Sequence, residues 1–186
     1  MIVNQSILDR LLEGNRRYLT QAQPGGDISP ALRRHTAEAG QQPCAIVITC
    51  SDSRVIPECI FSAGLGELFV IRVAGNVLDR HQLGSIEYAA AHLHCRLILV
   101  LGHTGCGAIG AALSGGGEGS IAYITDEILR AVGEVRDPDL ACRLNVQHAV
   151  ETIRREFAEH PEIPMADTDV LGAIYDIGSG DIRWLQ

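Results

Sequence analysis

The spacing of hydrophobic residues changes near residue 43. Before this point, from about residue 4 to residue 20, apolar side chains recur every three or four positions, as on one face of an amphipathic helix. A turn-forming QPGGD segment follows, and a second, more polar helical stretch continues to about Gly40. The pattern therefore predicts two N-terminal helices within about residues 4–40.

Short uninterrupted apolar runs replace the helical spacing after this change. Three runs, at 44–49, 68–73 and 96–101, are rich in β-branched residues and bounded by Gly, Pro or polar residues, which is typical of strands buried on both faces. Between the second and third runs, residues 83–93 have the small and apolar composition of a buried helix. Strand, crossover helix and strand in this order indicate a parallel sheet.

The remainder of the chain continues to alternate between helical and strand patterns. Helical stripes span about residues 121–132 and 140–157, and an apolar run at 170–177 is followed by a Gly-Ser-Gly turn and a short run at 182–185. We interpret the last two runs as a strand and its antiparallel return strand. Because no linker or repeat interrupts the pattern, we expect one α/β domain over residues 1–186, with its core beginning at about residue 43.

The composition is that of a globular protein, with 46% apolar and 20% charged residues among 186. A formal net charge of -8 and no basic run argue against a nucleic-acid partner, which would need clustered Lys and Arg. No apolar run approaches the roughly 18–20 residues of a membrane span, and the N-terminus does not have the pattern of a secretory signal. We therefore expect a cytoplasmic protein without a membrane partner, in which the six cysteines stay reduced.

Metal-binding residues follow two of the predicted strands. The first run leads into Cys50, within CSDSR, and the third leads into His103 and Cys106, within HTGCG. Loops at the carboxyl ends of parallel strands converge on one crevice, so these residues would meet if the two strands are neighbours. Two thiolates and an imidazole suit Zn²⁺. The sequence therefore predicts a zinc site formed by Cys50, His103 and Cys106.

Two charged residues, Asp52 and Arg54, lie close to the first ligand. Three protein ligands would leave one zinc position open to water, as in catalytic rather than structural sites. Asp52 could bind the metal itself or accept a hydrogen bond from that water, and Arg54 could hold the carboxylate off the metal. Such a site lowers the pKa of the water to roughly 7 and supplies hydroxide at neutral pH.

The two motifs together resemble those of the β-carbonic anhydrases. The resemblance extends over nearly the whole chain, through LLEGNRRY, PECIFSAGLGELFVIRVAGN, GSIEYAAAHL and GAIYDIGSGDIRWL. It implies zinc-dependent, reversible hydration of carbon dioxide to bicarbonate, on a four-stranded parallel sheet extended by an antiparallel edge strand. It also implies a homodimer in which the N-terminal helices, about residues 4–40, embrace the partner, and dimers of this kind could pair into tetramers.

The resemblance assigns a role to each matching site residue. The zinc ligands are again Cys50, His103 and Cys106, and Asp52 with Arg54 forms a catalytic dyad. The residues implied to act on the substrate are Gly107 through its backbone N–H, Gln41 from the partner chain, Phe69, Ala74 and Tyr88 as an apolar slot for carbon dioxide, and His92 as a proton shuttle.

Two positions depart from the family pattern. Val73 stands where Asn is frequent, and Val47 stands where one subgroup has the Trp of a regulatory bicarbonate pocket. Two other members of that pocket, Arg72 and Tyr88, are present. With the pocket incomplete, the resemblance favours the plant-type, open-site subgroup.

Several alternatives remain at this point. Hydrolysis of carbonyl sulfide or carbon disulfide could use the same zinc site, and a non-catalytic scaffold could retain it. The slot residues could be ordinary core, and His92 a solvated helix residue. We interpret the His92–Cys95 cluster as a decoy, and the remaining cysteines as small buried hydrophobes: Cys44, Cys59, Cys95 and Cys142.

Overall fold

A mixed five-stranded sheet organises the computed structural model, which describes residues 3–20, 25–160 and 167–185. The strands are β1 (Ala45–Thr49), β2 (Leu68–Arg72), β3 (Leu97–His103), β4 (Asp169–Tyr175) and β5 (Ile182–Leu185). Their order in the sheet is β2-β1-β3-β4-β5, and only β5 runs antiparallel to its neighbour. The expected single α/β domain, with four parallel strands and an antiparallel edge strand, is confirmed.

Seven α-helices and one short 3₁₀ turn accompany the described strands. The helices are α1 (Gln5–Thr20), α2 (Pro30–Ala39), α3 (Pro57–Ile60), α4 (Arg80–His92), α5 (Gly107–Leu113), α6 (Ile121–Val132) and α7 (Pro138–Glu159), and the 3₁₀ turn is η1 (Ala74–Asn76). Within these described residues, no helix is long and apolar enough to cross a membrane.

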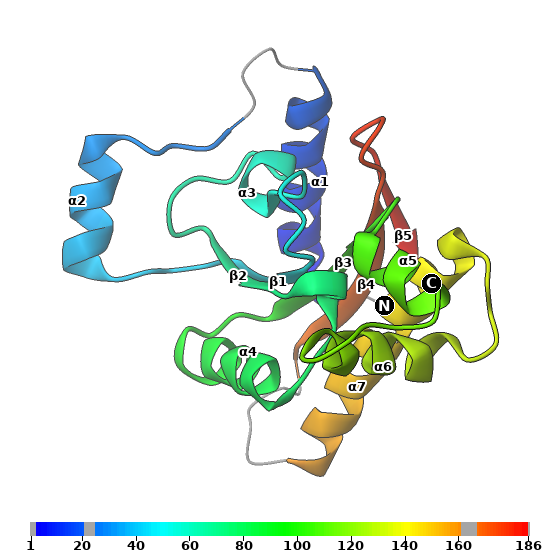
Figure 1. Ribbon diagram of the computed structural model, residues 1–186. Helices are drawn as coiled ribbons and strands as arrows, with labels where there is room; N and C mark the ends of the chain where they lie inside the picture. The colour runs from blue at the N-terminus through cyan, green and yellow to red at the C-terminus, as the bar shows by residue number, and fades with distance from the viewer. Residues whose placement is uncertain (1–2, 21–24, 161–166, 186) are drawn as a thin grey trace.

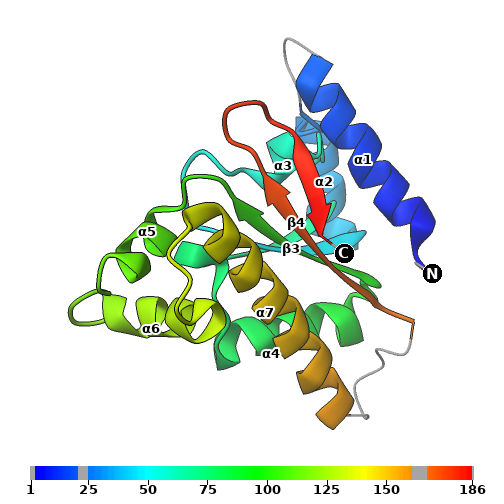
Figure 2. The same ribbon diagram turned by 90° about the vertical axis from the view of Figure 1, so that its right-hand side faces the viewer.

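Helices cover both faces of the sheet, as Figures 1 and 2 show. Side chains of a strand alternate between faces, so Ile46 and Ile48 of β1 pack with α4 and α7, while Ala45 and Val47 pack with α1 and α3. The central strands β1 and β3 are buried along their whole length. This double coverage is the reason why their sequences are continuous apolar runs rather than alternating ones.

The first helix packs tightly on the body of its own chain. Leu8 and Leu11 are buried, and the Asn15 amide donates to the carbonyls of Ile60 and Gly180. By contrast, α2 has no buried residue and projects away from the rest of the molecule (Figure 1). Both predicted N-terminal helices are therefore present, and their role in dimerisation stays a prediction.

Three short elements were not predicted from the sequence: α3, η1 and α5. A four-residue helix and a three-residue turn are too short to show a hydrophobic period. The α5 sequence, GAIGAAL, contains two glycines, which lower the helix propensity of such a short segment. Two of these elements, η1 and α5, lie next to the predicted metal ligands.

Candidate metal centre

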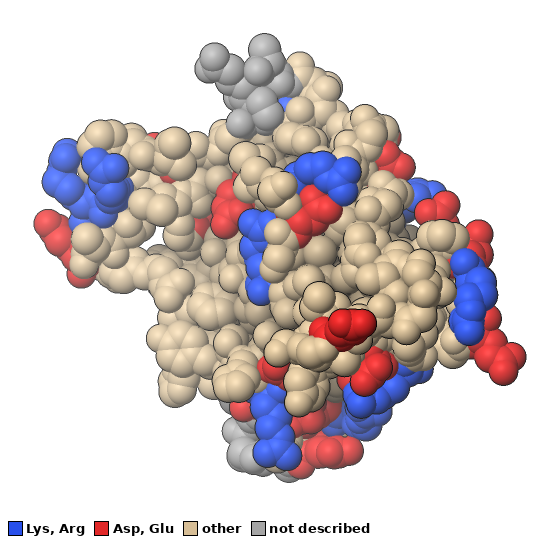
Figure 3. All heavy atoms as spheres, in the orientation of Figure 1, with Lys and Arg blue, Asp and Glu red and all other residues tan. Residues whose placement is uncertain are grey.

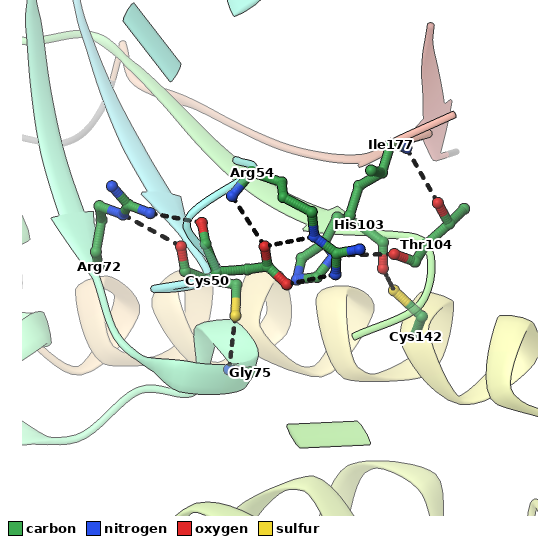
Figure 4. A network of polar contacts seen from close by, with 9 residues as sticks. Cys50, Arg54, Arg72, Gly75, His103, Thr104, Cys142 and Ile177 are labelled. Atoms are coloured by element: carbon green, nitrogen blue, oxygen red, sulfur yellow. Dashed lines mark hydrogen bonds and ion pairs between the residues drawn. The ribbon is translucent and has the colours of Figure 1, made fainter. Parts of the chain in front are cut away.

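The predicted ligands meet because β1 and β3 are neighbours in the sheet. Thr49 pairs with Leu101, and the Thr49 hydroxyl donates to the Leu101 carbonyl at 2.8 Å, which fixes the register just before the ligands begin. Cys50, His103 and Cys106 are all buried, and their ligand atoms lie within 4.8 Å of one another. Figure 4 shows Cys50 and His103 side by side at the ends of these strands.

A tight turn places the second and third ligands. His103 ends β3, Gly105 has a φ of +65°, and Cys106 immediately precedes α5. Thr104 anchors this turn to the end of β4: its N–H donates to the Tyr175 carbonyl at 3.0 Å, and its hydroxyl accepts from the N–H of Ile177 at 3.1 Å. The left-handed conformation at Gly105 lets the chain reverse within three residues.

The His103 ring is oriented for metal binding. Its Nδ1 lies 3.0 Å from the Thr104 carbonyl, an acceptor, so we assign the proton to Nδ1. Nε2 is buried and has no hydrogen-bond partner among the described residues. Because a buried polar atom without a partner is costly, this nitrogen fits a metal ion shared with the two cysteines.

The two cysteine sulfurs interact strongly with each other. A hydrogen bond from Cys106 lowers the pKa of the Cys50 thiol well below that of an ordinary cysteine, although burial opposes the shift. The N–H of Gly75 also donates to the Cys50 sulfur at 3.2 Å. The same hydrogen bond, together with burial, raises the pKa of Cys106. The pair therefore readily holds negative charge, which suits a thiophilic divalent cation that displaces the remaining proton.

Arg54 holds the carboxylate of Asp52 in a two-pronged ion pair. Its Nε donates to Oδ1 at 2.9 Å and its Nη2 to Oδ2 at 2.7 Å, while the Arg54 backbone N–H also donates to Oδ1. These hydrogen bonds hold the pKa of the Asp52 carboxyl well below its usual range. Asp52 is therefore ionised at neutral pH and fixed in orientation.

Comparisons with known proteins agree with this geometry. The family model described as carbonic anhydrase matches residues 45–182. Among solved structures, the β-carbonic anhydrase CafA of Aspergillus fumigatus superposes with a TM-score of 0.76 at 29% identity, covering 84% of this chain and 81% of that one. The chain belongs to the β-class carbonic anhydrase family.

Two bacterial carbonic anhydrases are similar in sequence. Carbonic anhydrase 2 of Mycobacterium tuberculosis is 43% identical over 127 residues, a match covering 67% of this chain and 61% of that relative's length. The carbonic anhydrase of Mycolicibacterium smegmatis is 34% identical over 184 residues, covering 93% of this chain and 89% of the relative. In this family, the buried Cys50–His103–Cys106 cluster is the zinc site.

The other residues implied by the family resemblance lie in several places. Phe69 of β2 and Tyr88 of α4 have ring centroids 6.3 Å apart, and Tyr88 and His92 are 5.3 Å apart, so the three rings form a row. Tyr88 is 49% exposed, and His92 is exposed at the end of α4. The predicted slot and the predicted shuttle are therefore in contact with each other.

The remaining substrate residues do not all meet within one chain. Ala74 is half-buried at the start of η1, and Gly107 is the exposed first residue of α5. Gln41 is exposed between α2 and β1, and within the described ranges no hydrogen bond joins it to the ligand cluster. Its predicted role depends on a partner chain.

The four cysteines outside the zinc site differ in burial. Cys95 and Cys142 are buried as expected, while Cys44 and Cys59 are only half-buried, and all six cysteines are free thiols. The Cys95 sulfur donates to the Pro43 carbonyl. In the part of the chain that the structure describes, the residues that come together as a group of three metal-binding side chains are Cys50, His103 and Cys106, and His92–Cys95 is not part of such a group.

Sequence reasoning missed the residues that support the first motif. Arg72 donates through Nε to the Cys50 carbonyl at 3.2 Å and through Nη2 to the Asp52 carbonyl at 2.7 Å (Figure 4). The only available signal was a charged residue within an otherwise apolar strand. Asn145 was also missed, although it is a polar residue in the middle of a buried helical stripe.

Proposed function

We propose that this protein catalyses the reversible hydration of carbon dioxide to bicarbonate and a proton. The observation that carries the proposal is the buried Cys50–His103–Cys106 cluster with an Arg54-bound Asp52 beside it. Three protein ligands are typical of catalytic zinc sites, and four of structural ones. When bound, zinc supplies Lewis-acid activation of water at neutral pH.

In this proposal Asp52 orients the reacting water. An ionised carboxylate can only accept hydrogen bonds, so a water that donates to Asp52 turns a lone pair toward the substrate carbon. Arg54 occupies both carboxylate oxygens and so restrains Asp52 from becoming a metal ligand. Arg72 holds the backbone of the same motif in place.

Gly107 is the proposed donor to the substrate oxygen. It is the first residue of α5, and an N–H at the start of a helix has no acceptor within the helix. A backbone donor at this point can stabilise the charge that develops on the substrate oxygen. Gly107 is exposed, and nothing lies within 4 Å of the position that a Cβ would occupy there, so the start of α5 is not covered by side chains on that side.

The proposed substrate slot is completed by a second chain. Phe69, Ala74 and Tyr88 provide an apolar surface suited to a small uncharged molecule. The partner chain contributes Gln41 to the same slot. Figure 3 shows that the surface between α2 and α4 is largely free of Lys, Arg, Asp and Glu. An uncharged surface with a half-exposed Tyr88 favours coverage by the partner, and His92 then lies where protons can pass to solvent.

We infer that the enzyme belongs to the open-site subgroup. Val47 is fully buried in β1 at the position where the regulated subgroup has Trp, and Arg72 donates to the carbonyls of Cys50 and Asp52. Both observations support an incomplete bicarbonate pocket. The pairing of Asp52 with Arg54 supports the same assignment. A zinc-loaded crystal structure at neutral pH should show Asp52 bound to Arg54, and Asp52 bound to zinc would contradict the inference.

Turnover on two substrates tests the proposed reaction. Purified protein with one zinc per chain should hydrate carbon dioxide in a stopped-flow assay and prefer it to carbonyl sulfide. A strong preference for carbonyl sulfide would replace the proposal with a hydrolase that uses the same site. Full zinc occupancy without turnover on either substrate would indicate a scaffold.

A further inference from the structure

One face of α7 lies directly behind the metal centre. Asn145, on this face, is 3% exposed, and its side-chain amide donates to the Gly75 carbonyl at 2.8 Å. The bond joins residues 70 positions apart, and it connects α7 to the η1 turn. A buried carbonyl needs such a donor, because a buried polar group without a hydrogen-bond partner destabilises the folded state.

Gly75 connects this amide to a zinc ligand. Its N–H donates to the Cys50 sulfur, while its carbonyl accepts from Asn145, so the residue is held at both ends. Its φ of +69° is the left-handed conformation that favours glycine. A Cβ here would lie 2.9 Å from Ile128 Cδ1 and 3.1 Å from the Ala108 Cβ. The position of the N–H donor is therefore closely determined by its surroundings.

The same face of α7 also contacts the segment that carries the second zinc ligand, His103. Cys142 lies one helical turn before Asn145, and its thiol donates to the His103 carbonyl at 3.2 Å. Figure 4 shows this contact and the one between Gly75 and Cys50 on the side of the site that faces the helices. Helix α7 thus contacts the segment that carries His103 directly, and it reaches the Cys50 sulfur through Gly75.

We propose that Asn145 is a positioning residue for the zinc centre, acting through the Gly75 N–H on the Cys50 sulfur. A hydrogen bond to a thiolate withdraws electron density from the sulfur and fixes its orientation, and both effects tune the metal that it binds. The inference rests on the zinc site of the family and on the Asn145–Gly75–Cys50 contacts. It does not depend on which substrate the enzyme uses.

The test uses Asn145→Leu, which keeps the size of the side chain and removes the amide, and Asn145→Ser, whose hydroxyl is too short to replace it. The control is Val150→Ala, a buried position of α7 in the core cluster on the sheet. Each protein is loaded with Co²⁺ to record the thiolate-to-metal charge-transfer band, and with Zn²⁺ to measure transfer to a chelator.

Both Asn145 variants should move the charge-transfer band to longer wavelength. Without the amide, the Gly75 N–H is no longer held against the Cys50 sulfur, and a thiolate with a weaker hydrogen bond is a stronger electron donor. They should also lower zinc affinity by roughly 10-fold to 100-fold, as loss of an outer-shell partner typically does. Val150→Ala should lower the melting temperature while leaving the band and the zinc affinity unchanged.

A purely structural Asn145 would give a different pattern. Its variants would then melt at a lower temperature, as Val150→Ala does, with the band and the zinc affinity of the wild type, and the proposal would be wrong. The wild-type protein provides a further test that does not require a folded variant. Loaded with ¹¹³Cd, it should show scalar coupling between the metal and the Gly75 amide proton, and absence of that coupling would also overturn the proposal.

Discussion

Two arginines act on the CSDSR segment in different ways. Arg54 binds the side chain of Asp52, whereas Arg72 binds the backbone carbonyls of Cys50 and Asp52. Arg54 therefore keeps the Asp52 carboxylate ionised and fixed in orientation, and Arg72 holds the backbone that carries the first zinc ligand. Lysine could replace neither contact, because it lacks the planar fork of donors.

Cys50→Ser should abolish most zinc binding, since a serine hydroxyl stays protonated at neutral pH and is a poor ligand for zinc. Cys95→Ser is the matched control, because its hydroxyl can still donate to the Pro43 carbonyl. Zinc content per chain, measured by atomic emission after dialysis, distinguishes them. Equal zinc content in the two variants would contradict the ligand role of Cys50.

The three ligands could be predicted from the sequence, because each follows a strand pattern and belongs to a short motif. The contacts that support them could not. Gly75 and Asn145 are separated by 70 residues, and neither has a local pattern that indicates a contact with the other. Only the packing of α7 against η1 brings them together. Gln41 is a further case, because its predicted role requires a second chain.

At the scale of elements, a close helix contact fixes α1 to the body of the chain. A Cβ on Gly14 would lie 1.8 Å from the Phe61 carbonyl oxygen, so α1 and the end of α3 can approach only because residue 14 is glycine. The Ser62 hydroxyl also donates to the Gly14 carbonyl at 2.9 Å.

Gly14→Ala should therefore destabilise the protein by about 2 kcal/mol or more, since the steric clash exceeds the gain in helix propensity. Gly84→Ala in α4 is the control. Its Cβ meets nothing within 4 Å, so the substitution should stabilise the protein by about 0.5–1 kcal/mol. Urea unfolding measures both changes. A neutral Gly14→Ala would mean that α1 does not pack against α3 in this way.

The strands could be predicted well because burial on both faces produces a continuous apolar run in the sequence. The short elements α3, η1 and α5 have no comparable pattern. Helix α5 illustrates the difference. It begins directly after Cys106, is seven residues long and contains two glycines, which lower its helix propensity.

At the scale of the whole molecule, zinc binding couples the stability of the protein to pH. In the folded state, hydrogen bonds from Cys106 and from the Gly75 N–H hold the pKa of the Cys50 thiol well below that of an ordinary cysteine. The folded state therefore binds fewer protons than the unfolded state at neutral and mildly acidic pH, and its stability falls as the pH falls through this range. Two zinc-bound thiolates should strengthen this dependence.

Acidification from about pH 8 to about pH 5 should release zinc and lower the melting temperature together, because protons compete with the metal for the thiolates. Calorimetry and zinc content measured over this range test the coupling. The chelator-treated protein should show a weaker pH dependence. A melting temperature that stays constant while zinc is lost would contradict the coupling between zinc binding and stability.

The exposed α2 helix predicts assembly. A ten-residue helix without buried side chains is marginal alone in water, so it should be stabilised by a partner chain. Sedimentation should give at least twice the chain mass of 20.0 kDa, and the amides of residues 30–39 should be protected from hydrogen exchange. A monomer in which these amides exchange freely would contradict the proposed dimer.

Carbon dioxide hydration by Asp52→Asn, with zinc content determined on the same sample, tests the role of Asp52 most directly. Asparagine keeps the size of the side chain, but its amide is neutral and cannot form the ion pair with Arg54. The zinc content should equal that of the wild type, and hydration should be slower by roughly 10-fold to 100-fold or more. Full activity at equal zinc content would contradict the role of Asp52 beside the metal.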